Sequence, residues 1–118
     1  MMQVKATREG LVGHRTASGY VIDAIVPFVA LPSVFALHRV VRVTNPANHR
    51  TAIAIVLDVG PWEVNDDAYV FDGRRPAAES GVDSRGRATN SAGIDLGERI
   101  WRDLEMQDNT LVTWEFLE

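Results

Sequence analysis

The sequence of 118 residues has no cysteine, so neither a disulfide framework nor a thiolate metal site is open to it. It also has no excess of positive charge. The formal net charge of −4 disfavours nucleic acid as a partner, because a phosphate backbone is bound by a basic surface. The histidines lack the spacing of metal ligands, and the aspartates lack the order of a calcium-binding loop. We therefore predict a protein without a metal ion or a cofactor.

No stretch has the character of a secretory signal or of a membrane span. The N-terminal MMQVKATREG carries charges and no apolar core. Residues 20–37 form the most apolar window and are long enough to cross a membrane, but Asp23, Pro27 and Pro32 interrupt them. We interpret this window as buried strands joined by turns. We predict no membrane span and leave the compartment open.

The clearest local pattern is a β-hairpin. In residues 40–45, VVRVTN, apolar Val41 and Val43 alternate with polar residues, which is typical of a half-buried strand. An Asn-Pro pair then starts a turn, and residues 51–58, TAIAIVLD, form a second run of strand formers. Together these segments predict a hairpin over residues 40–58.

Other segments are shorter or more polar. A strand, turn and strand are expected at residues 11–21, and the C-terminal NTLVTWEFL predicts a strand. Residues 63–93 are polar, charged and glycine-rich, so we predict a long inserted loop in which only AYVF, residues 68–71, forms a short strand. Loops of this length in compact domains are usually functional or disordered.

One helix is predicted near the C-terminus, in IDLGERIWRDLEM. Its apolar residues share one helical face: Leu96, Ile100, Trp101 and Leu104. Asp95, with Glu98 three residues later, fits an N-cap and capping box. Many short strands with one or two short helices predict a mainly β fold, a small barrel, over a single domain of residues 1–118.

Four motifs occur in order: TASG at 16–19, ALPS before VVRVTN, LDVGP at 57–61, and IDL at 94–96. As an ordered set they resemble the double-psi β-barrel of the rare lipoprotein A type, which is related to expansins and to the MltA-type lytic transglycosylases. The resemblance covers residues 13–117 and implies a six-stranded double-psi β-barrel. The chain departs from the family at Val59, where the family usually has arginine, and at Ser33, where it usually has glycine.

The resemblance implies that Asp58 is the general acid and base that cleaves a peptidoglycan glycosidic bond. The residues themselves support a raised pKa for Asp58, because it ends an apolar strand and shares a face with Ala52, Ala54 and Val56. An Asx turn that binds the next backbone amides is the structural alternative. Asp95 is the second candidate catalytic residue, for which an N-cap role is the alternative.

Further residues are candidates for binding a glycan. By resemblance, Thr16 and Ser18 line the groove beside Asp58, and His14 is close enough in sequence to join them. Trp62 and Tyr69 follow the Gly-Pro corner in a polar stretch, where flat aromatic faces suit sugar rings. Trp101 and Trp114 fit periodic apolar patterns and are expected in the core.

Three functions follow from this reading, of which the last is a structural assembly domain, since double-psi barrels host many functions. The first is a peptidoglycan lytic transglycosylase that acts on the cell wall, with peptidoglycan or another cell-wall polysaccharide as its partner. The second is a non-catalytic, expansin-like glycan-binding module of a larger phage or bacterial protein, which Val59 in place of arginine favours.

Overall fold

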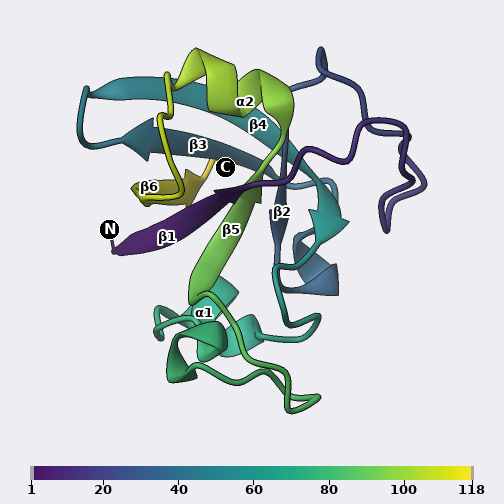
Figure 1. Ribbon diagram of the computed structural model, residues 1–118, viewed down its shortest axis with the longest axis vertical. Coiled ribbons are helices and arrows are strands. Elements are labelled where there is room, and N and C mark those ends of the chain that lie inside the picture. Colours follow the sequence, from purple (N-terminus) through teal and green to yellow (C-terminus); the bar gives the residue numbers. More distant parts are fainter. Residues whose placement is uncertain (1, 118) are drawn as a thin grey trace.

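The computed structural model describes residues 2–117 and shows a closed β-barrel with two short α-helices (Figure 1). Around the barrel the strands follow the order β1-β5-β2-β4-β3-β6. The elements are β1 (Gln3–Arg8), β2 (Phe28–Leu31), β3 (Val40–Asn45), β4 (Arg50–Val59), α1 (Asp67–Asp72), β5 (Ala92–Leu96), α2 (Glu98–Asp103) and β6 (Leu111–Phe116). Two 3-10 turns, η1 (Val34–Ala36) and η2 (Ala77–Ser80), complete them.

The barrel mixes parallel and antiparallel strand pairs, which a chain of simple hairpins cannot produce. β1 pairs with β5 and β2 pairs with β4 in parallel, whereas the remaining neighbours are antiparallel. β3 and β4 form the predicted hairpin, in register from Val40 opposite Ile55 to Asn45 opposite Arg50. The predicted mainly β, six-stranded barrel is therefore confirmed.

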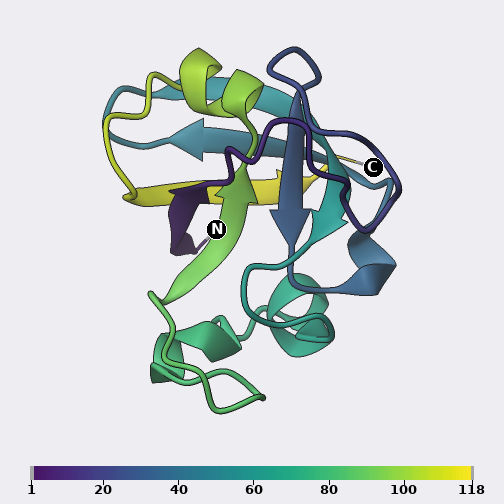
Figure 2. The same ribbon diagram turned by 45° about the vertical axis from the view of Figure 1, so that its right-hand side comes forward.

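The barrel interior is filled by the alternate residues of every strand, as the two-residue period of a strand requires. The inward-facing strand residues form one core with residues from α2 and its C-terminal end: Val4, Ala6, Val29, Leu31, Val41, Val43, Val56, Ile94, Leu96, Ile100, Leu104 and Val112. Trp101 and Trp114 pack against this core, as expected. Both views place α2 over β4 at one end of the barrel (Figures 1 and 2).

The predicted loop of residues 63–93 has more structure than its composition indicates. The AYVF strand is wrong, because these residues lie in α1, which begins at Asp67 and ends at Gly73 with a φ of 75°. A left-handed residue at this position is a common helix stop. α1 and η2 form a small lobe at the end of the barrel opposite α2 (Figures 1 and 2).

The strand, turn and strand expected at residues 11–21 are wrong, because this segment is a loop with one isolated bridge between Arg15 and Val21.

The predicted N-cap at Asp95 is also wrong. Asp95 lies within β5, where it pairs with Thr7 of β1 and Ala30 of β2, and the N-cap of α2 is Gly97. Gly97 has no room for a side chain, since a Cβ there would lie 2.4 Å from the Phe28 ring. Between residues 2 and 117, no helix is long and apolar enough to cross a membrane.

Candidate carboxylate site

A row of side chains crosses four neighbouring strands on the outer face of the barrel. Thr7 of β1 pairs with Asp95 of β5, Asp95 pairs with Ala30 of β2, and Ala30 pairs with Asp58 of β4. Paired residues project to the same face of a sheet. The neighbours of Ala30 along β2, Val29 and Leu31, belong to the core, so the row faces outward. Strand register alone therefore brings the two aspartates together across one small alanine.

Asp58 reaches this row through an irregularity in β4. Val29 pairs with Val56, but Ala30 pairs with Asp58, so Leu57 is an extra residue on β4. Without it, strict alternation would turn Asp58 inward with Val56, which is the face that the sequence pattern predicts. A bulge of this kind re-aims a side chain and is frequent next to functional sites.

A third carboxylate joins the aspartates from the end of β1. The Glu9 amide continues the β1–β5 ladder by donating to Leu96 O at 2.9 Å. The pKa of Glu9 is raised from 4.5 to about 8, mainly by burial and in addition by the charges of Asp58 and Asp95 and a hydrogen bond with Asp58. Among the described residues, the buried Glu9 Oε2 has no hydrogen-bond partner. Glu9 therefore carries a proton at neutral pH.

Asp95 also favours its neutral form, although less strongly. Its pKa is raised from 3.8 to about 6, because burial and the charge of Asp58 together outweigh the hydrogen bond from the Thr7 hydroxyl to Oδ1, which lowers the pKa. Two carboxyls beside Asp58 thus titrate above their ordinary range. Such a set holds and exchanges protons near neutral pH, which acid–base chemistry requires.

Asp58 is half-buried and is held by two backbone amides. Its Oδ1 accepts from Val59 N at 2.9 Å and from Ala17 N at 3.0 Å. The first bond belongs to its own turn, as the Asx-turn alternative predicts. The second comes from residues 16–19, so this segment lies against Asp58. Both amides engage the same oxygen.

Thr16 and Ser18 belong to the segment whose Ala17 amide contacts Asp58. Their hydroxyls are 2.9 Å apart, and the Ser18 amide approaches Leu57 O at 3.3 Å. Thr16 is buried, whereas His14 is exposed. The His14 amide donates to Leu11 O at 3.0 Å, and the His14 carbonyl accepts from Ile22 N at 2.9 Å.

The two predicted binding aromatics have different positions. Tyr69 is buried in the core at 3% exposure, so its predicted place in a glycan-binding surface is wrong. Its hydroxyl donates to Gly93 O at 2.9 Å and accepts from Trp114 Nε1 at 2.7 Å. Trp62 is half-buried, and its Nε1 donates to Asn90 Oδ1 at 2.8 Å.

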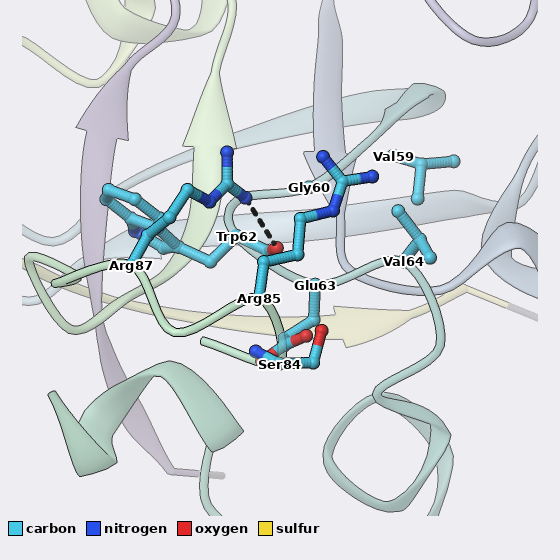
Figure 3. A pocket seen from close by; sticks show the side chains of 8 residues that line it. All are labelled: Val59, Gly60, Trp62, Glu63, Val64, Ser84, Arg85 and Arg87. Carbon is cyan, nitrogen blue, oxygen red and sulfur yellow. Dashed lines mark hydrogen bonds between the residues drawn. The ribbon is translucent and has the colours of Figure 1, made fainter. Parts of the chain in front are cut away.

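Trp62 lines a cavity of about 200 Å³ together with Gly60 and residues of the 84–87 turn (Figure 3). A Cβ at Gly60 would lie 3.8 Å from Asp95 Oδ2. Gly60 therefore lines the cavity and also lies next to Asp95 of the carboxylate cluster.

Glu9 is the residue that sequence reasoning missed. A signal for it exists: each carboxylate of the cluster ends a strand and is followed within two residues by glycine, as Glu9-Gly10, Asp58-Val59-Gly60 and Asp95-Leu96-Gly97. Between residues 2 and 117, no group of three or more His, Cys, Asp or Glu side chains has the arrangement of a metal site.

Solved structures share this architecture. The Streptomyces papain inhibitor matches with a TM-score of 0.56 and 20% sequence identity, over 99% of this chain and 94% of that chain. Cerato-platanin 3 from M. perniciosa matches with a TM-score of 0.57 and 10% identity, over 99% of this chain and 95% of that chain. At these identities the likeness establishes the barrel fold, which is of the double-psi type.

Sequence comparison adds a family. No curated protein matches the chain. One family model matches residues 1–115, nearly the whole sequence. The chain therefore belongs to the family described as "Domain of unknown function (DUF8814)".

Proposed function

We propose that this domain binds cell-wall glycan of the peptidoglycan type at the carboxylate cluster of Glu9, Asp58 and Asp95, and cleaves it by acid–base chemistry. One observation carries the proposal: among the described residues, a buried Glu9 oxygen has no hydrogen-bond partner, although two further carboxyls lie beside it and raise the pKa of Glu9. Structural carboxylates are normally paired or solvated, whereas desolvated carboxyls with shifted pKa values cluster at functional sites.

The reaction is a lytic transglycosylation with Asp58 as acid and base. The Glu9–Asp58 pair carries one proton, which Asp58 donates to the glycosidic oxygen as the bond from C1 to that oxygen breaks. The C6 hydroxyl of the same sugar attacks C1, forms the 1,6-anhydro ring and returns its proton to the pair. No water is consumed and the pair regains its starting state, so a second nucleophilic carboxylate is not needed, unlike in two-carboxylate hydrolases.

Neighbouring groups suit a sugar ligand. The hydroxyls of Thr16 and Ser18 lie on the segment whose Ala17 amide holds Asp58, so they are placed to bind sugar hydroxyls. Asp95 has a pKa of about 6, so it is neutral below about pH 6, and its Oδ1 accepts a hydrogen bond from Thr7. Both features reduce the repulsion between Asp95 and the negatively charged Asp58. The related rare lipoprotein A fold adds a family-level reason for a cell-wall substrate.

The second candidate is an expansin-like module that binds glycan without cleaving it. It is favoured by the two backbone amides on Asp58 Oδ1, which stabilise a carboxylate rather than a proton donor. Val59, in place of the usual arginine of the corner, points the same way.

One experiment separates the candidates. Purified sacculi are incubated with the domain, the pellet is assayed for bound protein, and the supernatant is analysed by mass spectrometry for muropeptides with 1,6-anhydro ends. Binding with release of anhydro ends supports the enzyme. Binding without release supports the module, and the absence of both overturns the proposal.

A further inference from the structure

The cavity at Gly60 lies between two segments that meet outside the barrel. The corner after β4 supplies one wall and the turn at 84–87 supplies the other (Figure 3). The lining residues are Val59, Gly60, Trp62, Glu63, Val64, Ser84, Arg85 and Arg87. Its volume of about 200 Å³ is smaller than the roughly 300–1,000 Å³ of drug-sized pockets, so it suits one sugar unit or a small polar group.

Local bonds hold the turn rigidly. Buried Asp83 accepts from the amides of Arg85 at 2.9 Å and Arg87 at 2.8 Å, and it pairs with the Arg87 guanidinium at 2.6 Å. That guanidinium lies 5.7 Å from the centre of the Trp62 ring, so Arg87 ties the turn to the corner. The charge of Arg87 is therefore largely neutralised by Asp83.

Arg85 is different. Among the described residues, no hydrogen bond or ion pair engages its guanidinium. Figure 3 shows the Arg85 and Arg87 guanidinium groups directed to the same side of the turn, toward Gly60 and Val59. The cavity thus presents one unneutralised cation in a protein whose net charge is −4.

Glu63 is the acidic group that also lines the cavity. It is buried, and its Oε2 accepts from Ser84 N at 3.0 Å. Its carboxylate lies beside Ser84, away from the two guanidinium groups (Figure 3). The side of the cavity that carries the guanidinium groups therefore has no acidic side chain of the cavity lining against it and is open to an anionic ligand.

We propose that this cavity binds the carboxylate of an acidic sugar unit, with Arg85 as the ligating cation and Trp62 as the surface on which the ring packs. A guanidinium matches a carboxylate with two parallel hydrogen bonds, and an indole offers a flat apolar face. The choice of a sugar rests on the proposed function. The nearby carboxylate cluster repels an acidic group, so together the two sites fix the direction of a bound glycan across Gly60.

The test is a pair of NMR titrations on the intact domain. N-acetylmuramic acid and N-acetylglucosamine share a ring and differ in the lactyl carboxylate of the first. We expect the acid to bind at least about tenfold more tightly, with shifts at the Trp62 indole N–H and the Arg85 amide, and with affinity that falls as salt is added. Arg85→Gln should remove the preference. Arg74→Gln, an exposed arginine outside the cavity lining, should retain it.

Several results would overturn the inference. Equal affinity for the two sugars would do so, and so would a preference that survives in Arg85→Gln. If sodium acetate at the same concentration caused equal NMR shifts, the cavity would bind any carboxylate, and the assignment to a sugar would be overturned. Cleavage of sacculi without the sugar preference would refute this inference alone. The preference without cleavage would refute the enzymatic proposal alone.

Discussion

The carboxylate cluster and the cavity, which both adjoin Gly60, are built in opposite ways. The carboxylate cluster is assembled by strand register from residues far apart in the sequence, such as Thr7 and Asp95, 88 positions apart. The cavity wall at 83–87 is held by contacts within one turn, where Asp83 and Arg87 are four positions apart. The first region concentrates like charges, and the second neutralises most of its own charge.

This difference separates what each region can do. Carboxyl groups packed together away from water have raised pKa values, so Glu9 and Asp95 hold protons at a higher pH than usual. These pKa values depend on the strand pairing of the whole barrel. The turn keeps one cation free because its neighbour is already paired. The proposals therefore assign acid–base chemistry to the cluster and recognition of an acidic ligand to the cavity.

The largest expected effect isolates the cluster. Asp58→Asn keeps the shape and an acceptor for the Ala17 and Val59 amides, but it cannot exchange a proton. We expect release of anhydro-muropeptides to fall by about 10²–10⁴-fold, with the melting temperature nearly unchanged and the sugar preference of the cavity retained. The readout is mass spectrometry of sacculus digests. Asp72→Asn, at the exposed end of α1, is the matched control and should keep full activity. Unchanged release from Asp58→Asn would assign Asp58 to its turn.

The next effect tests the backbone that joins the two regions. Gly60 has a φ of 141°, and Gly73, at the end of α1, has a φ of 75° with open space around it. We expect Gly60→Ala to lower the free energy of unfolding by about 1–3 kcal/mol and Gly73→Ala by about 1 kcal/mol, as measured by urea denaturation. Equal costs at the two positions would show that Gly60 imposes no special conformation.

A smaller effect loosens the attachment of the α1 lobe to the barrel while leaving the cluster alone. Tyr69→Phe leaves Gly93 O and Trp114 Nε1 without their shared hydroxyl. We expect a loss of about 1–2 kcal/mol in the free energy of unfolding by chemical denaturation. Val70→Ala, a nearby core truncation without a polar bond, controls for general destabilisation of α1. A neutral Tyr69→Phe would show that the hydroxyl does not hold the lobe.

The smallest effect concerns the proton on Glu9. Its pKa is 4.5 in the unfolded chain and about 8 in the folded protein, so between these values only the folded state holds the proton. The stability contribution of Glu9 therefore falls as pH rises from about 4.5 to about 8 and is level beyond. Glu9→Gln should match the wild type near pH 5 and exceed it by about 1 kcal/mol at pH 9, a figure reduced because the carboxyl is partly solvated. Thermal melts across pH measure this, and parallel curves for the two proteins would refute the raised pKa.

Local patterns determined much of the architecture. The alternation in VVRVTN and the turn chemistry of Asn-Pro predicted the hairpin of β3 and β4, because a strand with one buried face shows its period in the sequence. The order of the motifs around Asp58 predicted the barrel and the contact of residues 16–19 with Asp58. AYVF misled because its apolar residues fit a strand as well as the helix that Asp67 and Gly73 delimit.

Tertiary structure alone decided the site. Asp95 next to Glu98 fits a helix cap by local rules, but pairing with Thr7 and Ala30 draws it into β5. The extra residue Leu57 turns Asp58 outward, and the alternating pattern of β4 does not predict this bulge. Glu9 acquires its proton only because strands from both ends of the chain place it beside two aspartates and away from water. Local sequence patterns determined the β3–β4 hairpin and the C-terminal strand β6, whereas the charge state of the cluster arises from burial and from distances that exist only in the closed barrel.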